Sequence, residues 1–170
     1  MIDKYDVGVA GSIQVSLSVY GKDAVEKYLF NDPLMDGSKF QMQSAVNTLT
    51  NPGDGADIAK VFAHARNVVL RENNGARRNA TSVVIIFSDS PVTSDASKLQ
   101  EEIEKLKAFG SKVIIVAIGD MFEAGLKTLA TSPQHFIHID LDADISKDDK
   151  PDKVVELTKP GNLNNSYHSF

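Results

Sequence analysis

Two continuous runs of apolar, mostly β-branched residues constrain the fold of this chain more than any other feature. They span residues 82–87 (Ser-Val-Val-Ile-Ile-Phe) and residues 112–118 (Lys-Val-Ile-Ile-Val-Ala-Ile). Strands that are apolar on both faces are typical of the centre of a parallel sheet. Between the runs, residues 96–109 carry apolar side chains at helical spacing, and Gly110 follows as a stop signal. The pattern predicts a βαβ unit with a right-handed crossover.

The N-terminal half continues this alternation of strands and helices. Residues 13–19 alternate strictly between apolar and polar, which predicts a half-exposed strand, and residues 24–30 return beside it as an edge hairpin. Helices are expected at residues 38–50 and 58–70, with Asp57 as the N-cap of the second. The apolar face of the first helix consists of four residues: Met42, Ala45, Val46 and Leu49.

The C-terminal part adds a short helix after Asp120, a strand at residues 135–139 and a terminal helix around Val154. Strands that alternate with helices in this way predict an α/β domain with a largely parallel sheet and one antiparallel edge strand. We expect one domain over residues 1–150, followed by a helix and a flexible tail over residues 151–170.

The composition excludes several classes of function. The 170 residues carry a net charge of −5, which argues against a nucleic-acid partner and against anionic membranes. No apolar run approaches the roughly 20 residues that span a bilayer, so no membrane insertion is expected. The absence of cysteine excludes disulfides and thiolate metal sites. The first six residues are too polar for a secretory signal.

A ligand site is expected at the carboxyl ends of the strands, where open parallel sheets bind their ligands. Three loops meet this condition, and we expect them, with Gly11 and Ser12, to contact a ligand. Their polar residues are Ser88, Asp89 and Ser90 after the first apolar run, Asp120 after the second, and Asp54 and Asp57 before the helix at residue 58.

Asp89 follows an apolar strand directly and has three competing interpretations. A carboxylate at a strand end can hold Mg²⁺ together with waters and hydroxyls. It can also serve as a nucleophile or phosphoacceptor, as in a receiver-like domain. The third interpretation is structural, because an aspartate side chain can cap its own turn.

The order of these segments resembles that of the von Willebrand factor type A (vWA) domain. The likeness covers about residues 5–145 and rests on six short stretches: residues 6–10, 53–60, 74–80, 82–90, 110–119 and 126–136. The Gly-Ala-Arg-Arg-Asn-Ala stretch at residues 75–80 is most similar to members associated with the extracellular matrix and with collagen. The resemblance implies a Rossmann-like open sheet with helices on both faces, a non-enzymatic adhesion module and an extracellular location.

The resemblance also implies a metal-ion-dependent adhesion site (MIDAS), from which this sequence departs. The family takes an Asp-x-Ser-x-Ser loop from its first strand, a Thr before a later helix, and an Asp after its fourth strand. Only Asp89 matches, because the Thr position is Ala56 and the first strand with its loop is expected to be missing. One carboxylate holds Mg²⁺ poorly, since this ion gives up its water reluctantly. We therefore expect no cofactor, with Mg²⁺ at Asp89, helped by Asp57, as the alternative.

A missing first strand leaves unpaired backbone groups in the sheet, which are costly when buried. The chain is then a fragment or an atypical member, or the gap is closed by its own strands or by a strand from another chain.

Other motifs are less informative. The sequence has no Gly-x-Ser-x-Gly elbow and no phosphate-binding glycine loop, and its C-terminal aspartates lack the EF-hand pattern. Two N-glycosylation sequons occur, at Asn79 and Asn164, and they matter only in a secreted chain. The leading hypothesis is a module that binds a protein or matrix ligand. The alternatives are an assembly domain that forms homo-oligomers through an unpaired sheet edge, and a receiver-like domain.

Overall fold

The computed structural model describes residues 13–35, 39–53, 55–89, 91–92, 94–119, 123–140 and 149–159. These residues form two compact units. The sheet unit holds residues 81–92 and 103–159, and the hairpin unit holds residues 13–80 and 94–102.

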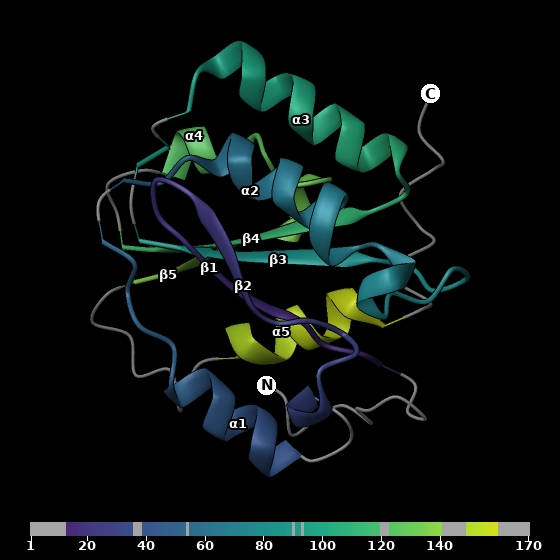
Figure 1. Cartoon of the computed structure of the whole chain (residues 1–170). Helices are drawn as coiled ribbons and strands as arrows, with labels where there is room; N and C mark the ends of the chain where they lie inside the picture. The colour runs from purple at the N-terminus through teal and green to yellow at the C-terminus, as the bar shows by residue number, and fades with distance from the viewer. Residues whose placement is uncertain are drawn as a thin grey trace. The chain divides into compact units, whose positions relative to one another are not determined.

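The sheet unit is built on three parallel strands in the order β3-β4-β5 (Figure 1). Strand β3 spans Val83–Ser88, β4 spans Lys112–Ile118, and β5 spans Phe136–Ile139. Helix α3 (Ala96–Ala108) follows β3 and precedes β4, which confirms the predicted βαβ unit. Gly110 has a φ of +88°, a conformation that suits glycine at the end of a helix.

Helices line both faces of this sheet. Helix α5 (Lys150–Thr158) buries Val154 and Leu157 against one face, and the strand residues there are Ile114, Val116, Ile137 and Ile139. Each such burial stabilises the fold by about 1.5–3 kcal/mol. Val113 and Ile115 alternate to the other face and are fully buried. Helix α4 (Glu123–Lys127) contacts β4 and lies on the opposite side of the strands from α5 (Figure 1).

The hairpin unit contains the predicted antiparallel pair. Strand β1 (Leu17–Tyr20) pairs with β2 (Ala24–Tyr28), with an irregularity in register between Leu17 and Ser18. Helix α1 (Lys39–Asn47) places the fully buried Met42 against this hairpin, where it contacts Val15, Leu17 and Tyr28. A 3-10 turn, η2 (Pro33–Met35), precedes α1.

Several local predictions need correction. Strand β1 begins at Leu17 and not at residue 13, and α1 ends at Asn47 and not at residue 50. The segment 58–70 is not one α-helix, because α2 (Ile58–His64) widens into the π-helical turn η3 (Ala65–Val69). Val46 is 39% exposed although the helical pattern placed it on the buried face. His135 closes the 3-10 turn η5 (Pro133–His135) and does not begin the last strand.

The turn η4 (Glu72–Asn74) lies between η3 and β3. Across the described residues, no helix is both long enough and apolar enough to cross a membrane. The predicted capping residue Ser38 lies outside the described residues.

Candidate functional site

The carboxyl edge of the sheet unit carries two of the predicted loops. Ser88 is the last residue of β3 and is buried, and Asp89 follows it in an exposed bend. Gly119 follows β4 with a φ of +83°, and its backbone N–H donates to the Ile139 carbonyl at 2.9 Å. The parallel register therefore brings the ends of these strands to one edge, as expected.

A polar cluster that was not predicted from the sequence lies at the end of β5. His138 Nε2 donates to the Gly119 carbonyl at 3.2 Å. The other ring nitrogen, Nδ1, lies 3.7 Å from Asp140 Oδ1. The other oxygen of Asp140 lies 3.9 Å from Lys150 Nζ at the start of α5. The edge thus combines an imidazole, a carboxylate and an ammonium group with the exposed carboxylate of Asp89. These are groups suited to contacts with a polar partner.

His135 lies in a different environment and does not share a site with His138. It is fully buried, its Nδ1 lies 2.6 Å from Ser132 Oγ, and its Nε2 has no hydrogen-bond partner among the described residues. Burial lowers the pKa of His135, and the positive charge of Lys112 lowers this pKa further. Both effects favour the neutral form of this histidine.

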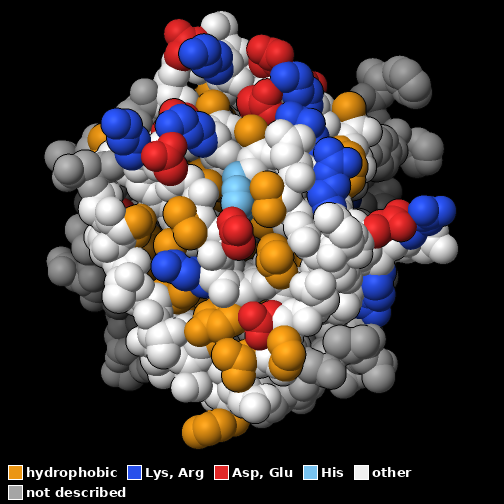
Figure 2. All heavy atoms as spheres, in the orientation of Figure 1, with side chains coloured by type: hydrophobic (Ala, Val, Ile, Leu, Met, Phe, Trp, Pro, Cys, Tyr) orange, Lys and Arg blue, Asp and Glu red, His pale blue; other side chains and the backbone are white. Residues whose placement is uncertain are grey.

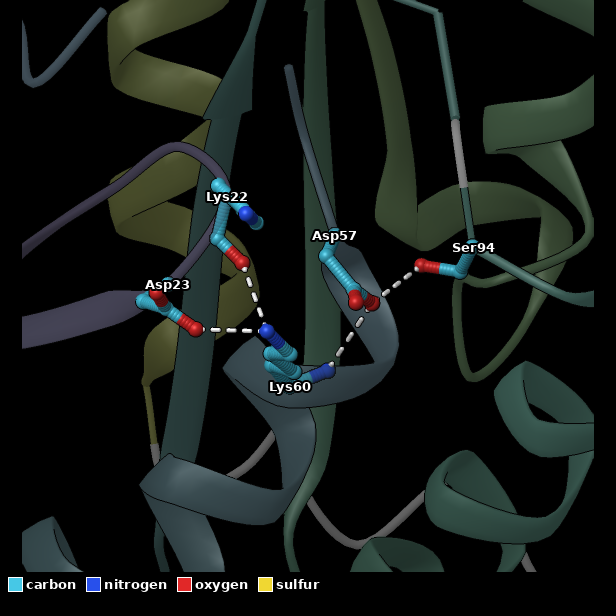
Figure 3. Close-up of polar contacts among 5 residues, drawn as sticks. All are labelled: Lys22, Asp23, Asp57, Lys60 and Ser94. Carbon is cyan, nitrogen blue, oxygen red and sulfur yellow. Dashed lines mark hydrogen bonds and ion pairs between the residues drawn. The ribbon is translucent and has the colours of Figure 1, made fainter. Parts of the chain in front are cut away.

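Asp57, in the hairpin unit, caps α2 as predicted. Its Oδ1 accepts a hydrogen bond from the Lys60 backbone N–H at 3.3 Å and another from Ser94 Oγ at 2.8 Å (Figure 3). The hydroxyl of Ser94 in turn accepts from the Ala59 N–H at 3.0 Å. Two of the N–H groups that a helix start leaves unpaired are satisfied in this way.

The same helix start is tied to the turn between β1 and β2. Lys60 Nζ lies 2.5 Å from Asp23 Oδ1 and 3.1 Å from the Lys22 carbonyl (Figure 3). The hydrogen bond and the charge of Lys60 hold the pKa of Asp23 below its usual value. The Asp57 N–H also donates to the Gly21 carbonyl at 3.1 Å. Both partners of the ion pair are well exposed, so the pair fixes the turn more than it stabilises the fold.

Asp89 and Asp57 are the residues that the sequence predicted as possible metal ligands. Ala56, which the resemblance matches with the family's Thr, is buried, and its side chain is a methyl group. No group of three or more His, Asp or Glu side chains in the described part of the chain could hold a metal ion. The remaining predicted contact residues lie outside the described residues: Gly11, Ser12, Asp54, Ser90 and Asp120.

A space-filling view shows how charged and hydrophobic side chains are distributed on one face. In Figure 2, acidic and basic side chains lie beside one another toward the top of the view, and several hydrophobic side chains gather toward the bottom. The described exposed hydrophobic residues include Phe40, which is 79% exposed on α1.

Comparison with known proteins relates this chain to one family. The family model for the von Willebrand factor type A domain matches residues 1–148. The collagen alpha-5(VI) chain of Mus musculus is 30% identical over 84 residues, which are 48% of this chain and 3% of that protein. The chain therefore spans a small part of the length of this curated relative.

Two solved structures share the fold. Proximal thread matrix protein 1 from the mussel byssus, with a zinc-occupied MIDAS motif, has a TM-score of 0.72 at 21% identity. That match covers 82% of this chain and 36% of the byssus chain. Manganese-loaded TRAP protein of Plasmodium vivax has a TM-score of 0.71 at 17% identity, over 95% of this chain and 61% of that one.

These matches confirm the α/β, Rossmann-like fold and the resemblance predicted from the short sequence stretches. Since the family model covers most of its length, this chain belongs to the von Willebrand factor type A domain family.

Proposed function

We propose that this chain is a non-enzymatic binding module of the extracellular matrix, which recognises a protein or matrix ligand through a degenerate MIDAS. Family membership supports the binding role. The extracellular assignment is supported by the relatives, which include a collagen chain and a thread matrix protein of the mussel byssus.

The observation that carries the proposal is the structural use of Asp57 beside Ala56. A metal-binding loop needs oxygen ligands here, yet Ala56 buries a methyl group and Asp57 Oδ1 accepts two hydrogen bonds. An N-cap of this kind contributes about 0.5–2 kcal/mol to stability. Binding of a metal at Asp57 would compete with that contribution.

The proposed contact surface includes the carboxyl edge of the sheet unit. Asp89 and the His138–Asp140 pair lie at that edge and present polar groups. The loops at residues 11–12, 53–57 and 119–122 stay predictions as further contact segments.

Titration of the purified chain with Mg²⁺ and with Mn²⁺ in a calorimeter tests the degenerate site. We expect no saturable heat, while a vWA domain with a complete Asp-x-Ser-x-Ser motif serves as the positive control. Saturable binding that Asp89→Ala abolishes and Asp149→Ala retains would contradict the proposal. Asp149 is the matched control because it is also an exposed aspartate of the sheet unit.

The binding role is tested separately, with a panel of purified matrix proteins immobilised on a sensor surface. We expect saturable binding of equal affinity in Mg²⁺ and in EDTA. A chain that binds none of the panel would count against a matrix ligand, and binding that EDTA abolishes would count against a degenerate site.

A second candidate function is assembly with another copy of the chain. Strand β2 pairs with β1 and with no other described strand, and three successive residues on it are exposed: Val25, Glu26 and Lys27. Exposed strand edges can pair with strands of other chains. Light scattering over a wide concentration range distinguishes the two functions, because a constant monomer mass excludes assembly.

A further inference from the structure

An exposed turn lies between η4 and β3. The Ala80 N–H donates to the Arg77 carbonyl at 3.2 Å, which closes a turn with Asn79 near its tip. Asn79, Ala80 and Thr81 are all exposed. The side chains of Asn79 and Thr81 are therefore accessible to another molecule.

The segments on either side of this turn are held in place. Before it, Arg78 makes two hydrogen bonds to Glu72, at 2.7 and 3.0 Å. After it, the Ser82 carbonyl accepts from the Lys112 N–H at 3.0 Å, and Ser82 Oγ lies 2.6 Å from Ser111 Oγ. The neighbouring side chains therefore have partners of their own, and Asn79 is the amide that the turn presents to solvent.

We infer that Asn79 is an acceptor for an N-linked glycan. Asn79-Ala80-Thr81 satisfies the Asn-x-Thr sequence requirement, and glycans attach to exposed loops of this kind in secreted proteins. The donor is an oligosaccharide linked to a lipid through pyrophosphate. The Asn79 amide nitrogen forms a bond to the anomeric carbon, and the carbon–oxygen bond to the pyrophosphate breaks. The lipid pyrophosphate leaves with that electron pair, and the amide nitrogen loses one proton.

This inference rests on the proposed extracellular function, because N-linked glycans are attached to chains that are secreted.

Secretion of the whole chain from human cells, behind an added cleavable leader, tests the inference. The secreted protein is treated with an amidase that converts a glycan-bearing asparagine to aspartate, in heavy-oxygen water, and its peptides are analysed by mass spectrometry. We expect the isotope label at residue 79. It should disappear in Asn79→Gln and Thr81→Ala, and persist in Thr81→Ser and in Asn164→Gln, which removes only the other sequon.

Circular dichroism of each secreted variant establishes that it is folded. An unlabelled Asn79 in folded, secreted chain would overturn the inference, as would label confined to Asn164. Failure of the proposed function has a different signature, because the unglycosylated chain from bacteria would then bind none of the matrix proteins.

Discussion

Gly75 lies close to the backbone of Phe30 and Asn31 in the hairpin unit. It ends the turn η4 with φ +88° and ψ 2°, and its N–H donates to the Glu72 carbonyl at 3.0 Å. A Cβ atom added to Gly75 would lie 2.5 Å from the backbone nitrogen of Asn31 and 2.9 Å from the carbonyl carbon of Phe30. These neighbours are backbone atoms, so a side-chain rotation cannot relieve the contact.

Two costs therefore add in Gly75→Ala. The left-handed backbone costs an alanine about 1–2 kcal/mol. Forcing the neighbouring backbone apart costs about 1–3 kcal/mol, as in other overpacked sites. We expect a total loss of about 2–5 kcal/mol, which is a large share of the roughly 5–15 kcal/mol that holds a typical domain folded.

Gly53→Ala separates the two costs. Gly53 has nearly the same φ, +86°, but no atom lies within 4 Å of its added Cβ, so only the backbone cost of about 1–2 kcal/mol applies. Gly125→Ala, within α4 and also unobstructed, should stabilise the chain by about 0.5–1 kcal/mol. Urea unfolding followed by circular dichroism measures all three changes. If Gly75→Ala costs no more than Gly53→Ala, the close approach to Asn31 does not exist in solution.

Three further predictions concern polar contacts. Asp57→Ala should cost about 1–2 kcal/mol, and a double-mutant cycle with Ser94→Ala should show coupling above about 0.5 kcal/mol; additive effects would contradict the shared hydrogen bond. Arg66 and Glu102 are 2.9 Å apart and mostly buried, so Glu102→Gln should cost about 1–3 kcal/mol, nearly independent of salt; a strong salt dependence would contradict this burial. The pKa of His135 is lower in the folded chain than in the unfolded chain. Unfolding therefore takes up a proton below pH about 6.5. The free energy of unfolding should fall as the pH drops below that value. Urea unfolding at pH values between about 5 and 8 measures this dependence. The free energy of unfolding should depend less on pH in His135→Gln than in the wild type, and equal pH dependence would contradict the role of His135.

The fold was predictable where the local pattern was strong. Strand β4 has the predicted bounds, Lys112–Ile118, because its continuous apolar run allows only a buried strand. Helix α3 ends within one residue of the prediction, since its apolar spacing and Gly110 agree. In α1 the pattern was weaker. Met42 is fully buried against the hairpin and Ala45 is buried, whereas Val46, the next residue along the helix, is partly exposed.

The site was predictable only in part, because its contacts join residues far apart in the sequence. Asp57 was identified as an N-cap from its position before an apolar helix. Ser94, which shares that carboxylate, is 37 residues away and has no local signature. The same holds for Lys60 and Asp23, also 37 residues apart. The pair His138 and Asp140 did have a signal, a charged residue two positions after a histidine at a strand end. Such a pair is common on protein surfaces, so the pattern alone does not indicate a site.

Asp57 also allows the metal question to be tested through stability. Its Oδ1 accepts from both Ser94 and the Lys60 N–H, and each such bond contributes about 0.5–1.5 kcal/mol. If Asp57 also bound a metal, Ser94→Ala would remove one of the two hydrogen bonds to that oxygen. The affinity for Mg²⁺ would then rise while the free energy of unfolding fell. If Asp57 is an N-cap alone, as we propose, Ser94→Ala lowers stability and leaves the Mg²⁺ titration unchanged. Asp57→Ala provides the limit, because it removes the carboxylate from both roles. A gain in Mg²⁺ affinity in Ser94→Ala that is absent from Asp57→Ala would therefore show that the carboxylate of Asp57 belongs to a metal site.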